Sequence, residues 1–122
     1  MINAYNNDPN LKVDFLNQLR WHREQDKIVK GSYGDDCTNG DFRGCAIGCS
    51  IHSLARIRNE KLCPSHHSLL QDFLGIPIAL AHLEDAIFES LPVEKALDWP
   101  IQFAQAIPVG ADLEMVVPHF VY

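Results

Sequence analysis

Two cysteines and a histidine recur at helical spacing near the centre of the sequence. Cys45, Cys49 and His52 stand at positions i, i+4 and i+7. On a helix that turns about 100° per residue, these three side chains lie within about 60° of one another. The apolar side chains of the same segment fall nearly on the opposite side: Ile47, Ile51 and Leu54. The helix is therefore either buried all round, or it turns its Cys/His face towards a separate pocket.

Two thiols and an imidazole are suitable ligands for zinc or another transition metal. A structural zinc site takes four such ligands at about 2.0–2.3 Å, so one more must come from outside this helix. His66 is the first candidate, followed by His22, His67, Cys63 and Cys37. An open fourth position that holds water would instead suit catalysis. The first hypothesis is metal binding, with zinc in a stabilising role.

The same residues admit two other interpretations. Free cysteine is among the most buried residue types, so Cys45 and Cys49 can be small core residues beside a hydrogen-bonded histidine. Alternatively, Cys45 lies early in a helix near Arg43, where the helix dipole and the cation favour a thiolate, and His52 can serve as a base. The first alternative predicts a protein–protein interaction or assembly module without chemistry, and the second predicts a thiol-dependent enzyme.

Further polar side chains fall on other predicted helices. His22 lies on the inward stripe of the first helix, which favours a hydrogen-bonded core histidine over a ligand. Arg56 lies one turn beyond the Cys/His face. Glu84 borders an apolar stripe and needs a partner, for which Arg43, Arg56 and a helix N-terminus are available. A last set at i, i+3 and i+7 favours a solvated face: His82, Asp85 and Glu89.

Capping residues and apolar periodicity predict the elements that carry these side chains. No alternating strand pattern recurs, so the expected fold is a single all-α domain of five to seven short helices over residues 1–122, with 31–41 as a surface loop. The predicted helices run from Pro9 to about Lys27 with Asp8 as cap, from Phe42 or Arg43 to Arg58 with Asp41 as cap, from Ser65 to Leu74 before Gly75, from Ile78 to Leu91, from Pro92 and from Pro100 as two short helices, and from Ala111 to Val117.

Length and composition narrow the class of protein. The chain has 122 residues, 47% of them hydrophobic, which suits one folded domain and excludes disorder. No apolar run is long enough to span a bilayer, and residues 1–8 lack the basic and apolar regions of a secretory signal, so we expect a cytoplasmic protein with reduced thiols. A net charge of −6 argues against a general nucleic-acid binder.

The charge is divided unevenly along the chain. Residues 1–61 carry nine basic and eight acidic side chains, whereas residues 62–122 carry one basic and eight acidic. The acidic C-terminal half and the loop at 31–41 are therefore the candidate surfaces for a homo-oligomer or a protein partner, should the chain be an assembly module.

Six short segments share a pattern with other sequences: Trp21-His22, Gly31-Ser-Tyr-Gly, the GCAxGCxxH-type segment from Gly44 to His52, Leu74-Gly-Ile-Pro77, Leu83 to Glu89, and Ala106 to Leu113. In these segments, from about Trp21 to Leu113, the chain resembles a group of small hypothetical proteins of bacteria and phages. It implies a self-contained domain associated with mobile elements, and it assigns no activity to any residue.

Overall fold

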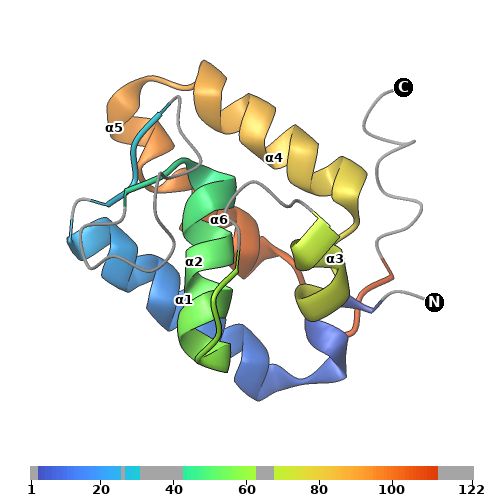
Figure 1. Cartoon of the computed structure of the whole chain (residues 1–122). Coiled ribbons are helices and arrows are strands. Elements are labelled where there is room, and N and C mark those ends of the chain that lie inside the picture. Colours follow the sequence, from blue (N-terminus) through green and yellow to red (C-terminus); the bar gives the residue numbers. More distant parts are fainter. Residues whose placement is uncertain (1–2, 26, 31–42, 63–67, 113–122) are drawn as a thin grey trace.

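The computed structural model of this chain describes residues 3–25, 27–30, 43–62 and 68–112 (Figure 1). The described residues form helices and no strand, so the predicted all-α class is confirmed. In chain order the elements are the 3-10 helix η1 (Ala4–Asn7) and the α-helices α1 (Pro9–Glu24), α2 (Ala46–Arg58), α3 (Ser68–Leu74), α4 (Ile78–Ser90), α5 (Val93–Ala96) and α6 (Trp99–Ala106).

Helix α1 begins as the sequence predicts and ends slightly earlier. Asp8 Oδ1 accepts a hydrogen bond from the backbone N–H of Asn10 at 2.9 Å, and Pro9 occupies the first helical position. The helix ends at Glu24, because the chain from Lys27 turns into an extended segment. The bridge between Ile28 and Gly44 pairs that segment with the approach to α2.

Helix α2 begins at Ala46, later than predicted, and Cys45 is its N-cap residue. The cause is the bridge to the 27–30 segment. Gly44 donates its N–H to the carbonyl of Lys27 and accepts from the N–H of Val29, each at 2.8 Å. An extended Gly44 cannot also be helical. The predicted cap, Asp41, lies outside the described residues.

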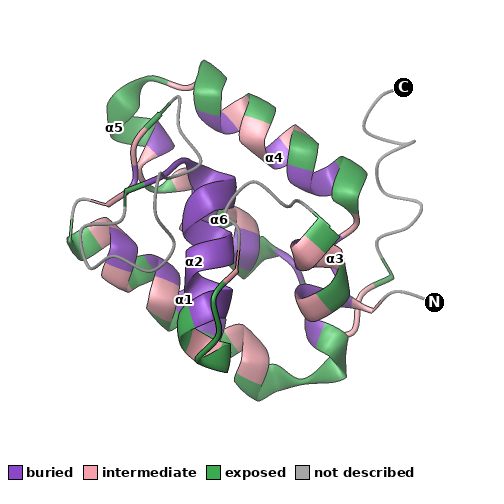
Figure 2. Cartoon of the chain, viewed as in Figure 1, coloured by how far each residue is buried: buried purple, intermediate pink, exposed green. Residues whose placement is uncertain are grey.

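Helix α2 is the central element and is buried all round its first ten residues. Every residue from Ala46 to Ala55 is buried (Figure 2). Helices α1, α3, α4 and α6 all pack against it. Of the two arrangements that the sequence left open, the structure therefore has the fully buried helix. Cys45, Cys49 and His52 face neighbouring helices and not solvent.

The prolines and one glycine set the remaining boundaries. Pro77 and Pro92 are the N-caps of α4 and α5, and Pro100 lies in the first turn of α6. Gly75 has a φ of +66°, and a Cβ there would lie 2.0 Å from the carbonyl oxygen of Asn3, so glycine is required.

Two predicted helix boundaries extend beyond the described residues. Helix α3 is described from Ser68 onwards, and the predicted start at Ser65 falls outside. The predicted helix from Ala111 is not seen in its first two residues, since Asp112 pairs with Asn3 in an antiparallel bridge. The rest of that prediction, 113–117, lies beyond the described range.

Candidate functional site

Cys45, Cys49 and His52 share α2, but the structure gives each a different neighbourhood. In the described part of the chain, these three do not form a group with all ligand atoms within 4.8 Å of one another. Cys49 is fully buried, and its Sγ lies 3.2 Å from the carbonyl oxygen of Gly44 and 3.5 Å from that of Lys27. A thiol that donates to backbone carbonyls behaves as a core residue.

His52 contacts α1, where it meets His22. The Nε2 of His22 lies 2.6 Å from the Nδ1 of His52, and the two rings meet nearly edge to face. The Nδ1 of His22 lies 2.7 Å from the carbonyl oxygen of Gln18. His22 is thus a hydrogen-bonded core histidine, as the sequence predicted, and its partner is one of the predicted ligands.

Burial and nearby cations keep both imidazoles neutral. Burial, together with the smaller effect of the charges of Arg56 and Lys27, lowers the pKa of His22 and of His52 to about 4. Arg56 is exposed, and its guanidinium carbon lies 3.9 Å from the centre of the Trp21 ring. Its Nε donates to Oε1 of Gln18 at 2.8 Å.

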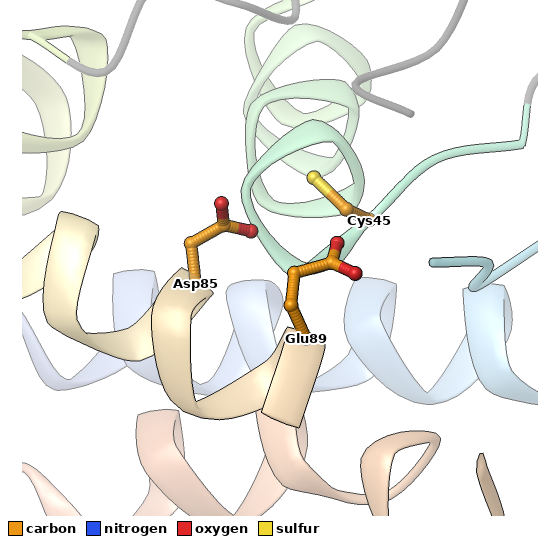
Figure 3. Close-up of side chains that lie close together, drawn as sticks. All are labelled: Cys45, Asp85 and Glu89. Atoms are coloured by element: carbon orange, nitrogen blue, oxygen red, sulfur yellow. The ribbon is translucent and has the colours of Figure 1, made fainter. Parts of the chain in front are cut away.

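Cys45 lies on the other side of the core, beside α4. Its Sγ and one carboxylate oxygen each of Asp85 and Glu89 lie within 4.8 Å of one another. In Figure 3 the two carboxylates extend from α4 towards the thiol at the start of α2. Asp85 and Glu89 are one turn apart, so they project from the same face of their helix. One thiol and two carboxylates form a candidate ligand set for a metal ion.

The thiols are not activated as nucleophiles. Burial, assisted by the charge of Asp85 and opposed by the N–H groups of Gly48 and Ile47, raises the pKa of Cys45 to about 12. Burial likewise raises the pKa of Cys49, and the neighbouring Cys45 adds to it. Reactive cysteines have the opposite shift and partial exposure. The geometry gives no support to a thiol-dependent enzyme at these two positions.

Glu84 is buried, as expected from its place beside the apolar stripe, but it lacks the predicted ion pair. In the described ranges no salt bridge joins it to Arg43 or Arg56. Burial and then the charge of Asp85 raise the pKa of Glu84 to about 8. The carboxyl group is therefore largely protonated at neutral pH, and neutralisation takes the place of pairing.

The remaining predicted ligands, His66, His67, Cys63 and Cys37, lie outside the described residues, so their roles stay predictions. The sequence did single out Asp85 and Glu89, but as part of a solvated face. Their proximity to Cys45 depends on how α4 packs against α2. The spacing of i and i+4 in α4 was the available signal, and the sequence held nothing to link it with position 45.

Comparisons with family models, curated proteins and solved structures found no match. No helix of the described residues is long and apolar enough to cross a membrane.

Proposed function

We propose that this protein binds a divalent transition-metal ion between Cys45, Asp85 and Glu89. The observation that carries the proposal is the convergence of three ligand atoms within 4.8 Å from two helices that are far apart in sequence. In a tetrahedral zinc site, neighbouring ligand atoms lie about 3.5 Å apart, so the side chains need to close by roughly an ångström.

The donor set favours zinc over the hard cations. Mg²⁺ and Ca²⁺ take oxygen ligands almost exclusively, whereas a thiolate selects zinc and its transition-metal neighbours. Zinc would also offset the unfavourable electrostatics of the cluster, where the charge of Asp85 opposes ionisation of Cys45. A bound cation reverses this effect, because it attracts the thiolate and both carboxylates and so favours ionisation of Cys45.

The ion would have a stabilising role, since it joins the start of α2 to the second half of α4. A ligand that binds only the folded state adds its binding free energy to the stability of that state. Three protein ligands leave a further coordination position, which water or a fourth side chain can fill. The predicted donors His66, His67 and Cys63 are candidates for that place.

The test is metal titration of untagged, chelator-treated protein, followed by thermal unfolding. With free zinc at about a hundred times its dissociation constant, we expect stabilisation of about 2.7 kcal/mol. Cobalt, used as a probe, should give a sulfur-to-metal charge-transfer band. An unchanged melting temperature with no such band contradicts the proposal.

Matched variants separate this ligand set from the one predicted from sequence. Cys45→Ser, Asp85→Asn and Glu89→Gln should each weaken zinc binding, and the sulfur-to-cobalt band should vanish in Cys45→Ser alone. Asp72→Asn and Glu94→Gln remove exposed acids elsewhere on the surface and should bind zinc as the unaltered chain does. Cys49→Ala should retain the cobalt band. Loss of the band in Cys49→Ala, with its retention in Cys45→Ser, would indicate that Cys49, and not Cys45, binds the metal ion.

A further inference from the structure

A pocket of about 330 Å³ lies where the chain passes from α4 through α5 into α6 (Figure 1). The three helices contact one another, and each contributes residues to the lining. None of the three proposed metal ligands is among these residues. Small-molecule sites usually have volumes of about 300–1,000 Å³, so this pocket suits a small ligand.

Three half-buried side chains give the pocket an apolar floor. Ile87 and Leu91 lie one turn apart on α4, and Trp99 lines the pocket from α6. The indole Nε1 of Trp99 donates to the carbonyl oxygen of Glu84 at 3.0 Å, and its ring lies 5.8 Å from that of Phe103, centre to centre. These contacts hold the indole in place, so a ligand can pack on it without ordering it first.

The rim of the pocket has one available charge of each sign. Asp98 also lines the pocket, but its Oδ1 accepts from Nε of Arg23 at 3.1 Å, so its charge is offset. Glu94 and Lys95 line the pocket from α5, and both are exposed. In the described part of the chain, neither of these two side chains makes an ion pair or a hydrogen bond. A carboxylate and an ammonium group are therefore both available beside the apolar floor.

We propose that this pocket binds a free α-amino acid with an apolar side chain. The hydrocarbon of the ligand packs against Trp99 and its two apolar neighbours on α4. The ammonium group of the ligand donates to the carboxylate of Glu94, and the ligand's carboxylate accepts from Nζ of Lys95. One small zwitterion thus matches the apolar floor and both charges of the rim.

The three contacts distinguish this class of ligand from simpler molecules. Burial of a large apolar side chain strengthens binding by more than about tenfold, and glycine lacks that side chain. Each charge contact lies on the exposed rim and contributes a smaller factor, about fivefold. A simple amine or a simple carboxylate makes only one of the two charge contacts. Internal residues of a polypeptide have neither backbone charge, so the pocket favours a free amino acid over a protein segment.

The test is an NMR titration of the ¹⁵N-labelled full chain with L-phenylalanine at pH 7, at constant ionic strength and with chelator present. The indole N–H resonance of Trp99 should shift, whereas that of Trp21, which does not line the pocket, should stay in place. Glycine should bind more than about tenfold more weakly. Phenylpropionate, which lacks the ammonium group, and phenylethylamine, which lacks the carboxylate, should each bind about fivefold more weakly. An unmoved Trp99 resonance, an equal shift of Trp21, or equal affinity for glycine or for either analogue overturns the proposal.

Two variants at exposed positions test which group binds which charge. Glu94→Gln should abolish the preference for L-phenylalanine over phenylpropionate and keep the preference over phenylethylamine. Lys95→Gln should have the opposite effect. Asp72→Asn and Lys61→Gln remove exposed charges elsewhere and should keep both preferences. If Glu94→Gln and Lys95→Gln also keep both preferences, the proposal is wrong, whereas the metal site is untouched by either result.

Discussion

The two sides of α2 treat buried titratable groups in opposite ways. Towards α1, His22 and His52 are neutral, bonded to each other and surrounded by cations. Towards α4, Cys45 meets the two carboxylates of Asp85 and Glu89. The first side satisfies its polar atoms within the protein. On the second side, a thiol and two carboxylates lie close together, and their negative charges become favourable when a cation binds between them.

The two sides should therefore contribute differently to stability: one stabilises the chain without a ligand, and the other only when a metal ion is bound. A closed hydrogen-bond chain contributes to stability whether or not anything is bound, and breaking it leaves a buried donor unsatisfied. A cluster of thiol and carboxylates contributes little by itself, because its members oppose one another's ionisation. The α1 side should therefore dominate the stability of the metal-free chain, and the α4 side should matter once metal is present.

The largest expected effect is the loss of His22 in metal-free protein. His22→Ala leaves a cavity and removes the hydrogen-bond partner of Nδ1 of His52, at a cost of about 3 kcal/mol. Glu89→Gln should change the free energy of unfolding by no more than about 0.5 kcal/mol under the same conditions, since Glu89 is exposed. Urea unfolding measures both. Comparable losses of unfolding free energy in the two variants would contradict the contrast between the two sides of α2. His82→Ala, which removes an exposed histidine of α4, is the control for the loss of an imidazole.

The second effect is acid destabilisation from the histidine pair. The folded pKa values of about 4 lie below the ordinary value of 6.5, so between these pH values the unfolded chain binds more protons. The contribution of the pair is complete above pH 6.5 and is lost as the pH falls towards 4, by about 3 kcal/mol for the two coupled rings.

Glu84 masks part of this dependence, because its shift has the opposite sign. Its folded pKa of about 8 lies above the ordinary 4.5, so its contribution is complete below pH 4.5 and is lost as the pH rises to 8. The acid loss should therefore be measured by urea unfolding in Glu84→Gln, between pH 7 and 4.5. A flat profile in that variant would mean that the imidazoles are already charged or exposed in the folded state.

A smaller effect concerns the thiols. At pH 7.5 Cys45 and Cys49 should react with iodoacetamide about a hundredfold more slowly than in urea, because burial raises both pKa values and restricts access. Zinc should slow Cys45 further and leave Cys49 unchanged, because only Cys45 lies in the proposed metal site. Peptide mass spectrometry distinguishes these positions from the other cysteines. Rapid labelling of Cys45 in the folded protein would revive the thiol-enzyme hypothesis.

Local signals were sufficient to predict most of the fold from the sequence. Asp8 and Pro9 began α1, Gly75 ended α3, and the prolines preceded α4 and α5, since each of these residues acts through its own backbone or its nearest neighbours. The start of α2 was predicted too early because Gly44 pairs with Lys27 and Val29, and no local pattern encodes that bridge.

The candidate site was less predictable for the same reason. The helical face of Cys45, Cys49 and His52 was recognisable from their spacing. Because the helix is buried all round, however, these residues contact different neighbouring elements. Position 45 meets α4, and position 52 meets α1. Which partner each receives depends on the packing of distant helices, and residue types at i and i+4 carry no information about it.

The smallest expected effect tests whether the cations beside the α1 side act on it as charges. Arg56 lowers the pKa of His52, second only to burial, although its guanidinium is exposed and partly screened by solvent. Arg56→Gln should therefore raise the pKa of His52 in an NMR titration, while Arg58→Gln should not. The rise should shrink at high salt, since screening already weakens the contribution of Arg56 there. A pKa of His52 that is identical in both variants at low salt would mean that burial and the bond to His22 alone keep the imidazole neutral, and the α1 side would then differ from the α4 side in its hydrogen bonding but not in its charge.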